Sequence, residues 1–154
     1  MLTKALKLPP RAVRVEDCRA VELPTVTDPR GALTFMETER HVPFEIKRVF
    51  YIYGVPAGES RGVHAHRRLH QVLICLSGGF EVAVDDGRSR EVHRLDRPSQ
   101  GLYVPPLIWT SMSKFDPGTV CLVLTSDYYD ESDHVLDYSL FLSLRRRSVR
   151  RTVS

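Results

Sequence analysis

Short runs in which hydrophobic and polar residues alternate, separated by turn residues, extend through most of the chain. In the run at 45–53, Ile46, Arg48, Phe50 and Ile52 would share one face of a strand, and the residues between them would share the other. Similar runs recur about every 8–12 residues, a spacing typical of β-sandwiches and β-barrels. The pattern therefore predicts a mainly β-stranded protein.

Turn sequences separate the expected strands. Asp85-Asp86-Gly87 predicts a hairpin between strands at 80–84 and 90–95. Asp116-Pro117-Gly118 predicts a second hairpin, which would join the strands on either side of it. The other expected strands are at 71–76, 101–104, 108–113 and 119–126.

A helical pattern is found only in the C-terminal part of the chain. Its N-terminal cap would be Ser132 or Asp133. The apolar stripe that follows at helical spacing consists of Val135, Leu136, Leu140, Phe141 and Leu144. We therefore expect an all-β fold, a single jelly-roll barrel with a short C-terminal helix. The expected parts are an N-terminal extension at 1–20, the barrel domain with its helix at 21–142, and a basic tail at 143–154.

The net charge of the chain is concentrated at its end. The formal charge is +3 over 154 residues, but the last ten residues hold five arginines and no acid. Without them, 17 basic residues face 19 acidic ones, so the body is slightly acidic. This balance argues against a nucleic-acid-binding domain. We expect the tail to be a solvated or frayed end of the last helix, outside any site.

Apolar runs are short, and two of the three cysteines lie within them. No stretch approaches 18 consecutive apolar residues, so no transmembrane helix is expected. The first ten residues lack the apolar core of a secretory signal. Cys75 and Cys121 lie in apolar runs, and with Cys18 they make an odd number. These features predict a cytoplasmic protein with reduced, buried cysteines.

Two histidines carry the most specific pattern in the chain. His64 and His66 are two residues apart, so both imidazoles would point to the same face of a strand. With Gly58, Gln71 and Gly78 they form the pattern G-x5-H-x-H-x4-Q-x6-G. This pattern resembles the first conserved motif of the cupin superfamily of jelly-roll barrels, in which many members carry Glu at the Gln position. The alternative is a pair of interior polar groups without a chemical role.

The metal ligands that many cupins use are incomplete here. Those cupins bind a metal through the two histidines and Glu of this motif and one histidine of a second motif. In the corresponding segment at 101–112, Thr110 stands close to the place of that histidine, and Gln71 is a weak neutral ligand. His70 is the alternative third ligand, four residues after His66. We expect no metal and no other cofactor.

Several further motifs occur in register with the histidine pair. Together they resemble the sugar 3,4-ketoisomerase family, also called WxcM-like or FdtA-type proteins, over about residues 20–142. The matching segments are 28–31, 43–49, 61–66, 85–87, 101–106, Trp109, 126–131 and 137–138. The family is similar in fold to the deoxysugar 3,5-epimerases. The resemblance implies a metal-independent homodimer that converts dTDP-4-keto-6-deoxyglucose to a dTDP-3-keto-6-deoxyhexose for deoxyaminosugar biosynthesis.

The resemblance and the residue chemistry suggest a proton-transfer site. Moving a ketone from C4 to C3 requires a base for the C3 proton, a task that suits a neutral histidine. The resemblance implies that His64 is this base and that His66 is its partner. The enolate oxygen needs hydrogen-bond donors, for which His66, Arg30, Tyr51 and Arg61 are candidates.

The remaining candidate residues would hold the nucleotide. Arg48 or Arg61 could bind a phosphate in a bidentate manner, although Arg48 could equally be an exposed strand residue. The candidates for stacking on thymine are Tyr51, Tyr53, Tyr103 and Trp109, each of which could instead pack in the core. No phosphate-binding glycine loop is present in the sequence.

Two positions bear on the product. Arg30 is similar to the galacto-forming members of the family, which carry His near the position of Thr110, whereas the gluco-forming members pair Tyr with Arg. Arg with Thr matches neither type, and because Thr is a poor acid we expect the gluco product. The alternatives are a 3,5- or 3-epimerase on the same barrel, a metal-dependent oxygenase, and a non-enzymatic module that binds dTDP-sugars. For the expected homodimer, residues 32–37 are the candidate for exchange between subunits.

Overall fold

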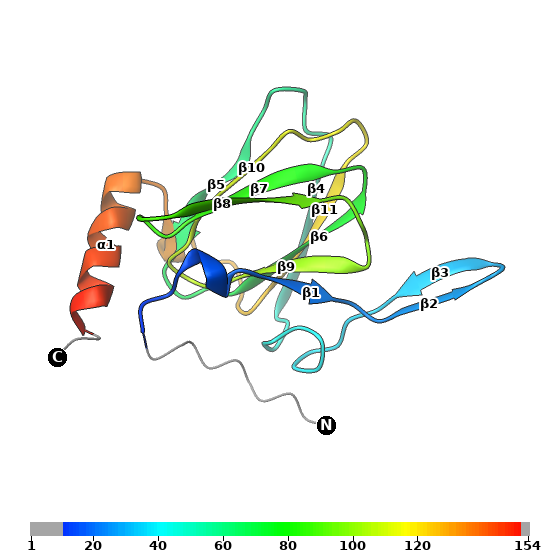
Figure 1. The fold of residues 1–154 in the computed structure, drawn as a ribbon, viewed down its shortest axis with the longest axis horizontal. Helices are drawn as coiled ribbons and strands as arrows, with labels where there is room; N and C mark the ends of the chain where they lie inside the picture. The colour runs from blue at the N-terminus through cyan, green and yellow to red at the C-terminus, as the bar shows by residue number, and fades with distance from the viewer. Residues whose placement is uncertain (1–10, 152–154) are drawn as a thin grey trace.

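Two five-stranded antiparallel sheets face each other in the computed structural model, which describes residues 11–151 (Figure 1). The first sheet has the order β1 (Arg19–Glu22), β9 (Gln100–Val104), β6 (Gln71–Ser77), β11 (Val120–Thr125) and β4 (Arg48–Tyr53). The second has the order β12 (His134–Val135), β5 (Arg61–His66), β10 (Trp109–Ser113), β7 (Phe80–Asp85) and β8 (Arg90–Leu95). The expected jelly-roll barrel with one C-terminal helix is confirmed.

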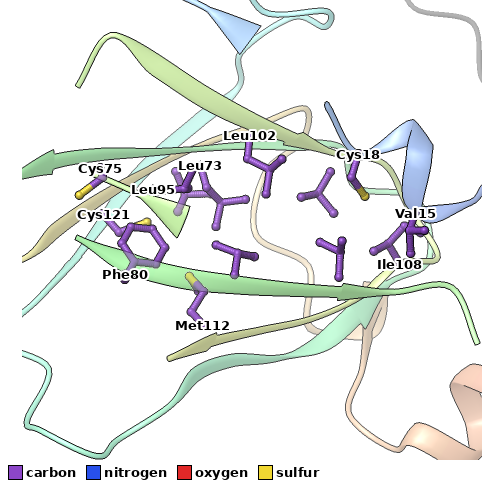
Figure 2. Packing of buried hydrophobic residues seen from close by; sticks show 14 of the residues in the cluster. Val15, Cys18, Leu73, Cys75, Phe80, Leu95, Leu102, Ile108, Met112 and Cys121 are labelled. Atoms are coloured by element: carbon purple, nitrogen blue, oxygen red, sulfur yellow. The ribbon is translucent and has the colours of Figure 1, made fainter. Parts of the chain in front are cut away.

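The main hydrophobic core fills the space between the two sheets. Figure 2 shows Leu73 and Leu102 from the first sheet lying opposite Phe80 and Met112 from the second. All three cysteines are buried and free, and the sequence predicts this burial for Cys75 and Cys121. Burial raises the pKa of Cys18 and Cys121 to about 12, which keeps their thiols protonated.

One of the two expected hairpins is present. Asp85 pairs with Arg90 where β7 turns into β8. The expected hairpin around Asp116-Pro117-Gly118 is wrong, because β10 pairs with β5 and β7 while β11 pairs with β4 and β6. The segment between them carries the chain from one sheet to the other. The Asp116 N–H donates to the carbonyl of Gly79 at 2.8 Å, which fixes this crossing against the start of β7.

A third, two-stranded sheet projects from the barrel (Figure 1). It consists of β2 (Thr25–Asp28) and β3 (Gly31–Thr34), which pair only with each other among the strands of residues 11–151. Gly31 has a φ of 126° at the turn, a conformation that L-residues rarely adopt. Val26 and Leu33 are more than half exposed on this hairpin.

The C-terminal helix begins later than expected. Helix α1 spans Tyr138–Arg151, and the carboxylate of Asp137 accepts a hydrogen bond from the Leu140 N–H at 2.9 Å. The expected cap at Ser132 or Asp133 is therefore wrong, because these residues form a 3-10 turn, η2 (Glu131–Asp133), ahead of β12. Val135 belongs to β12 and packs with Ala65 and Phe141. Within the described part of the chain, no helix is long and apolar enough to cross a membrane.

The two chain ends pack against the barrel more closely than the sequence suggests. Val13 and Val15 lie in the main core, the latter in a short 3-10 turn, η1 (Val15–Asp17). Arg145 is buried, and its guanidinium donates to the carbonyls of Val13 and Leu107. The expectation that the arginine tail is solvated is therefore wrong at Arg145, which joins the helix to the N-terminal segment. The first ten residues, part of the expected extension, lie outside the described residues, as do 152–154 of the tail.

Candidate functional site

A cavity of about 300 Å³ opens between the two sheets. The inner faces of β4, β5, β6, β10 and β11 form its walls, and β12 closes one side. Its lining combines apolar side chains with a few polar ones, and none of the lining residues is acidic. The polar and charged members are Arg48, Arg61, His64, His66, Gln71, Thr110 and His134.

The two histidines of β5 face this cavity together, as their spacing predicts. His64 Nε2 lies 3.1 Å from His66 Nε2, so one ring donates a hydrogen bond to the other. Thr110 is opposite His64 in the paired strand β10, and its hydroxyl donates to the carbonyls of Gly62 and His64 at 2.8 and 3.2 Å. The Thr110 hydroxyl therefore holds the backbone of β5 in place beside His64.

A third histidine, His134, completes the group. It is paired with His66 across the short β12–β5 ladder. The ring centroid of His134 lies 5.2 Å from that of His64 and 4.6 Å from that of His66. The sequence pattern does not indicate His134, because residues 134–136 fall within the predicted helix. The available signal is that His134 lies three residues after the end of the acidic 126–131 motif of the family resemblance.

Asp133 supports the histidine group from behind. Its buried carboxylate accepts hydrogen bonds from the backbone N–H groups of Arg68 and Leu69 at 2.9 and 3.2 Å. Its Oδ2 also lies 3.3 Å from Nδ1 of His66. A carboxylate behind one ring nitrogen favours a proton there and leaves the other nitrogen, Nε2, directed at the cavity.

Burial keeps the two β5 histidines neutral. Desolvation, with a smaller contribution from His134, lowers the pKa of His64 from 6.5 to about 4. Desolvation and the neighbouring His64 and His134 lower the pKa of His66 to about 4, although Asp133 opposes this effect. Both rings are therefore uncharged near pH 7, the state in which a histidine can accept a proton.

Two arginines place positive charge at the cavity. The half-buried Arg48 guanidinium lies 4.6 Å from the ring centroid of Phe50 and 5.1 Å from that of Tyr129. It borders both the main cavity and a smaller recess beside Asp130. Arg61 at the start of β5 is exposed on the cavity wall. The two cations are thus available to an anionic group that enters from the open side.

The structure does not bring all the predicted site residues to the cavity. Tyr51 lies at its edge, but its ring is exposed beside Tyr53, at a centroid distance of 5.8 Å. Tyr103 is buried outside the cavity, where its hydroxyl lies 2.7 Å from Nδ1 of His70. Trp109 packs against Tyr138 and Phe141 and helps to hold helix α1.

Arg30 also lies away from the cavity of its own chain. It occupies the turn of the β2–β3 hairpin, where its side chain is 90% exposed and forms an ion pair with Asp28 at 2.7 Å. Figure 1 shows this hairpin extending away from the barrel. Arg30 is not among the residues that line the cavity of its own chain.

Beyond the two histidines of β5, the ligand positions of the cupin metal motif do not fit a metal in this chain. Gln71 lines the cavity with a neutral amide, and the Thr110 hydroxyl is engaged by backbone carbonyls. His70, the alternative ligand, is paired with Tyr103 outside the cavity. The residues that could hold a metal are instead His64, His66 and His134.

Comparisons with known proteins identify several relatives of this chain. The family model FdtA, described as WxcM-like, C-terminal, matches residues 16–146. A TDP-4-oxo-6-deoxy-alpha-D-glucose-3,4-oxoisomerase from Aneurinibacillus thermoaerophilus is 43% identical over 80% of this chain and 88% of its own. A mutant of the 3,4-ketoisomerase QdtA from Thermoanaerobacterium thermosaccharolyticum, in complex with TDP-4-keto-6-deoxyglucose, is similar in structure. It has a TM-score of 0.85 and 36% identity, covering 87% of this chain and 97% of its own.

A more distant structure bears on the fold alone. The rmlC epimerase of Mycobacterium tuberculosis is 18% identical and has a TM-score of 0.66, covering 80% of this chain and 70% of its own. The expected similarity in fold to the epimerases is thus confirmed. Because the family model spans most of the described residues, from η1 into helix α1, the chain belongs to the FdtA, WxcM-like family.

Proposed function

We propose that this protein is an isomerase, a TDP-4-keto-6-deoxyglucose 3,4-ketoisomerase. The observation that carries the proposal is the neutral His64 at the cavity wall, hydrogen-bonded to His66, which is backed by Asp133. The relative from Aneurinibacillus and the QdtA structure with its sugar nucleotide support the same activity. The reaction requires a base that carries no positive charge. It also requires nearby cations that can bind the diphosphate of the substrate.

The reaction moves one carbonyl group along the ring without a net change in composition. His64 takes the proton from C3, and the electrons of that C–H bond form a double bond between C3 and C4. The C4 carbonyl oxygen thereby becomes an enediolate oxygen, which a cationic donor at the cavity such as Arg61 would stabilise. Return of a proton to C4 and loss of the proton from the C3 hydroxyl complete the 3-keto product. His66, between His64 and Asp133, is placed to relay a proton.

Nuclear magnetic resonance of the products in D₂O tests the proposed activity. Purified protein is incubated with dTDP-4-keto-6-deoxyglucose, and we expect a 3-keto sugar that carries deuterium at C4. An epimerase would leave the ketone at C4, and a binding module would leave the spectrum of the sugar unchanged. Either of these two outcomes contradicts the proposal.

The configuration of the product at C4 stays a prediction. The Thr110 hydroxyl donates its hydrogen to backbone carbonyls, so it is not placed to supply an acidic proton to C4. We propose the gluco product on this ground. In H₂O, the coupling between the protons on C4 and C5 is large in the gluco product and small in the galacto product, so one further spectrum distinguishes them.

We also propose a homodimer in which the β2–β3 hairpin of one chain reaches the cavity of the other. Val26 and Leu33 on the hairpin are exposed, as are Val49, Tyr51 and Tyr53 on the outer face of the edge strand β4. A second copy would cover these apolar side chains and the unpaired edge of β4. It would also place Arg30 beside the partner's bound substrate, which its own barrel does not allow.

Mixed dimers test whether Arg30 acts across the interface. The variants Arg30→Ala and His64→Asn, each with reduced turnover alone, are unfolded together and refolded as a mixture. We expect turnover to recover, because each mixed dimer then holds one site with both residues intact. A mixture of His64→Asn with His66→Ala is the matched control and should not recover, since both residues lie on β5 of one barrel. No recovery with Arg30→Ala, or a monomer in sedimentation at micromolar concentration, would contradict the proposal.

A further inference from the structure

The three imidazole rings at the cavity wall have the spacing of metal ligands. One nitrogen from each of His64, His66 and His134 lies within 4.8 Å of the other two. In a tetrahedral zinc site with Zn–N bonds of about 2.0–2.1 Å, ligand nitrogens are roughly 3.3–3.4 Å apart. His64 Nε2 and His66 Nε2 are already 3.1 Å apart, and Zn²⁺ would replace the proton that they share in this hydrogen bond. The nitrogen of His134 lies within 4.8 Å of the other two ligand atoms and would have to approach more closely to complete the triangle.

Two of the rings are oriented by groups behind them, as in established metal sites. His134 Nδ1 lies 3.1 Å from the backbone carbonyl of Asp130, which can only accept, so this nitrogen carries the proton and Nε2 holds the lone pair. His66 Nδ1 lies 3.3 Å from the Asp133 carboxylate without hydrogen-bond geometry, and its Nε2 is left for the cavity. Histidines that bind metals almost always donate their second N–H to a carboxylate or a carbonyl, as His134 does here.

The surroundings leave room for one further ligand and supply negative charge. The cavity of about 300 Å³ lies in front of the rings, so a fourth position would be open to water or an anion. Asp133 and Asp130 lie behind the rings. Arg48 and Arg61 line the same cavity and oppose a bare cation, so a negatively charged fourth ligand such as hydroxide would be favoured.

We propose that His64, His66 and His134 form a binding site for one Zn²⁺ ion and that Zn²⁺ inhibits the isomerase. The inhibition rests on the proposed function: coordination occupies the lone pair with which His64 would take the C3 proton. Metal binding and proton transfer at His64 exclude each other. The site is distinct from the cupin ligand set, because its third ligand comes from β12 rather than from the strand that carries Thr110.

Calorimetry with tag-free, chelator-treated protein tests the binding. We expect one Zn²⁺ per chain, and we expect Co²⁺ at the same site to give the visible absorption of a tetrahedral centre. In His134→Gln the affinity for Zn²⁺ should fall by more than about 100-fold. Loss of an outer-shell partner alone lowers metal affinity 10–100-fold, and His134 would be a direct ligand. His93→Gln, on β8 outside the cluster, is the matched control and should bind Zn²⁺ as the wild type does. Equal affinity in His134→Gln and the wild type would overturn the proposed site.

Turnover measured on the same samples tests the inhibition separately. We expect stoichiometric Zn²⁺ to lower wild-type turnover at least about tenfold below its chelated rate, in line with the contribution of a general base, and EDTA to restore it. In His134→Gln, compared with its own chelated rate, the same Zn²⁺ should have little effect. Unchanged or increased turnover with Zn²⁺ bound would overturn the exclusion between metal and base. If the chelated protein has no ketoisomerase activity, the proposed function fails, while the calorimetric result still decides the metal site.

Discussion

His64→Asn is expected to lower kcat by roughly 10²–10⁴-fold, the usual contribution of general acid–base catalysis. The asparagine side chain keeps polar atoms near the cavity but has no nitrogen that accepts a proton near neutral pH. The fold should survive, because His64 is half-buried at a cavity wall and its neighbours in β5 keep their ladder bonds to β10. Exchange of the C3 proton with solvent deuterium should be lost together with turnover. Product formation and exchange are measured by nuclear magnetic resonance in the presence of EDTA.

A histidine outside the cavity supplies the control for this substitution. His93→Asn changes the same residue type on β8, in the second sheet but at its far edge. Its turnover per folded protein should equal that of the wild type. Full activity in a correctly folded His64→Asn protein, judged by its circular dichroism and its Tm, would rule out His64 as the base.

Arg145→Ala is expected to lower the free energy of unfolding by about 2–4 kcal/mol. The substitution removes the donor for the carbonyls of Val13 and Leu107, two groups far apart in sequence. Hydrogen bonds to charged groups contribute roughly 1.5–3 kcal/mol each, and release of a buried charge offsets part of their loss. Arg145 is indeed costly to bury: desolvation lowers its pKa, although the charge of Asp86 opposes this effect.

Thermal unfolding measures this loss. For a chain of this size, 1 kcal/mol corresponds to roughly 2–4 °C, so the Tm should fall by about 5–15 °C. Arg147→Ala is the matched control, because Arg147 is exposed on the same helix and should leave the Tm nearly unchanged. Truncation after Leu144 removes the same buried group and should destabilise the protein similarly. Equal Tm values for the Arg145 and Arg147 variants would show that the buried guanidinium does not hold the helix.

Most of the fold follows from local patterns in the sequence. Alternation of hydrophobic and polar residues predicts β4 and its inward face correctly, and Asp85-Asp86-Gly87 predicts the β7–β8 hairpin. The segment at Asp116-Pro117-Gly118 shows the limit of such patterns. A turn sequence indicates that the chain changes direction, but it does not determine which strand becomes the neighbour. That choice depends on contacts across the barrel, such as the bond from Asp116 to Gly79.

The site is predictable in part, for a similar reason. The spacing of His64 and His66 places both on one face of a strand, and the structure puts both at the cavity. His134 is seventy positions after His64, and only the pairing of β12 with β5 brings it to the same wall. The sequence predicts a solvent-exposed Arg145 because arginine is mostly exposed. The carbonyls that accept its hydrogen bonds, those of residues 13 and 107, come together only on folding.

The short strand β12 couples helix α1 to the cavity wall. Its two residues have different neighbours. His134 lines the cavity, while Val135 packs against Phe141 of helix α1. Release of the helix would remove the cover of Val135 and loosen the only two ladder positions that hold His134 against β5. Helix docking and assembly of the histidine group therefore form one cooperative unit. Local unfolding at the C-terminus would then displace His134 from the cavity wall while the rest of the barrel remains folded.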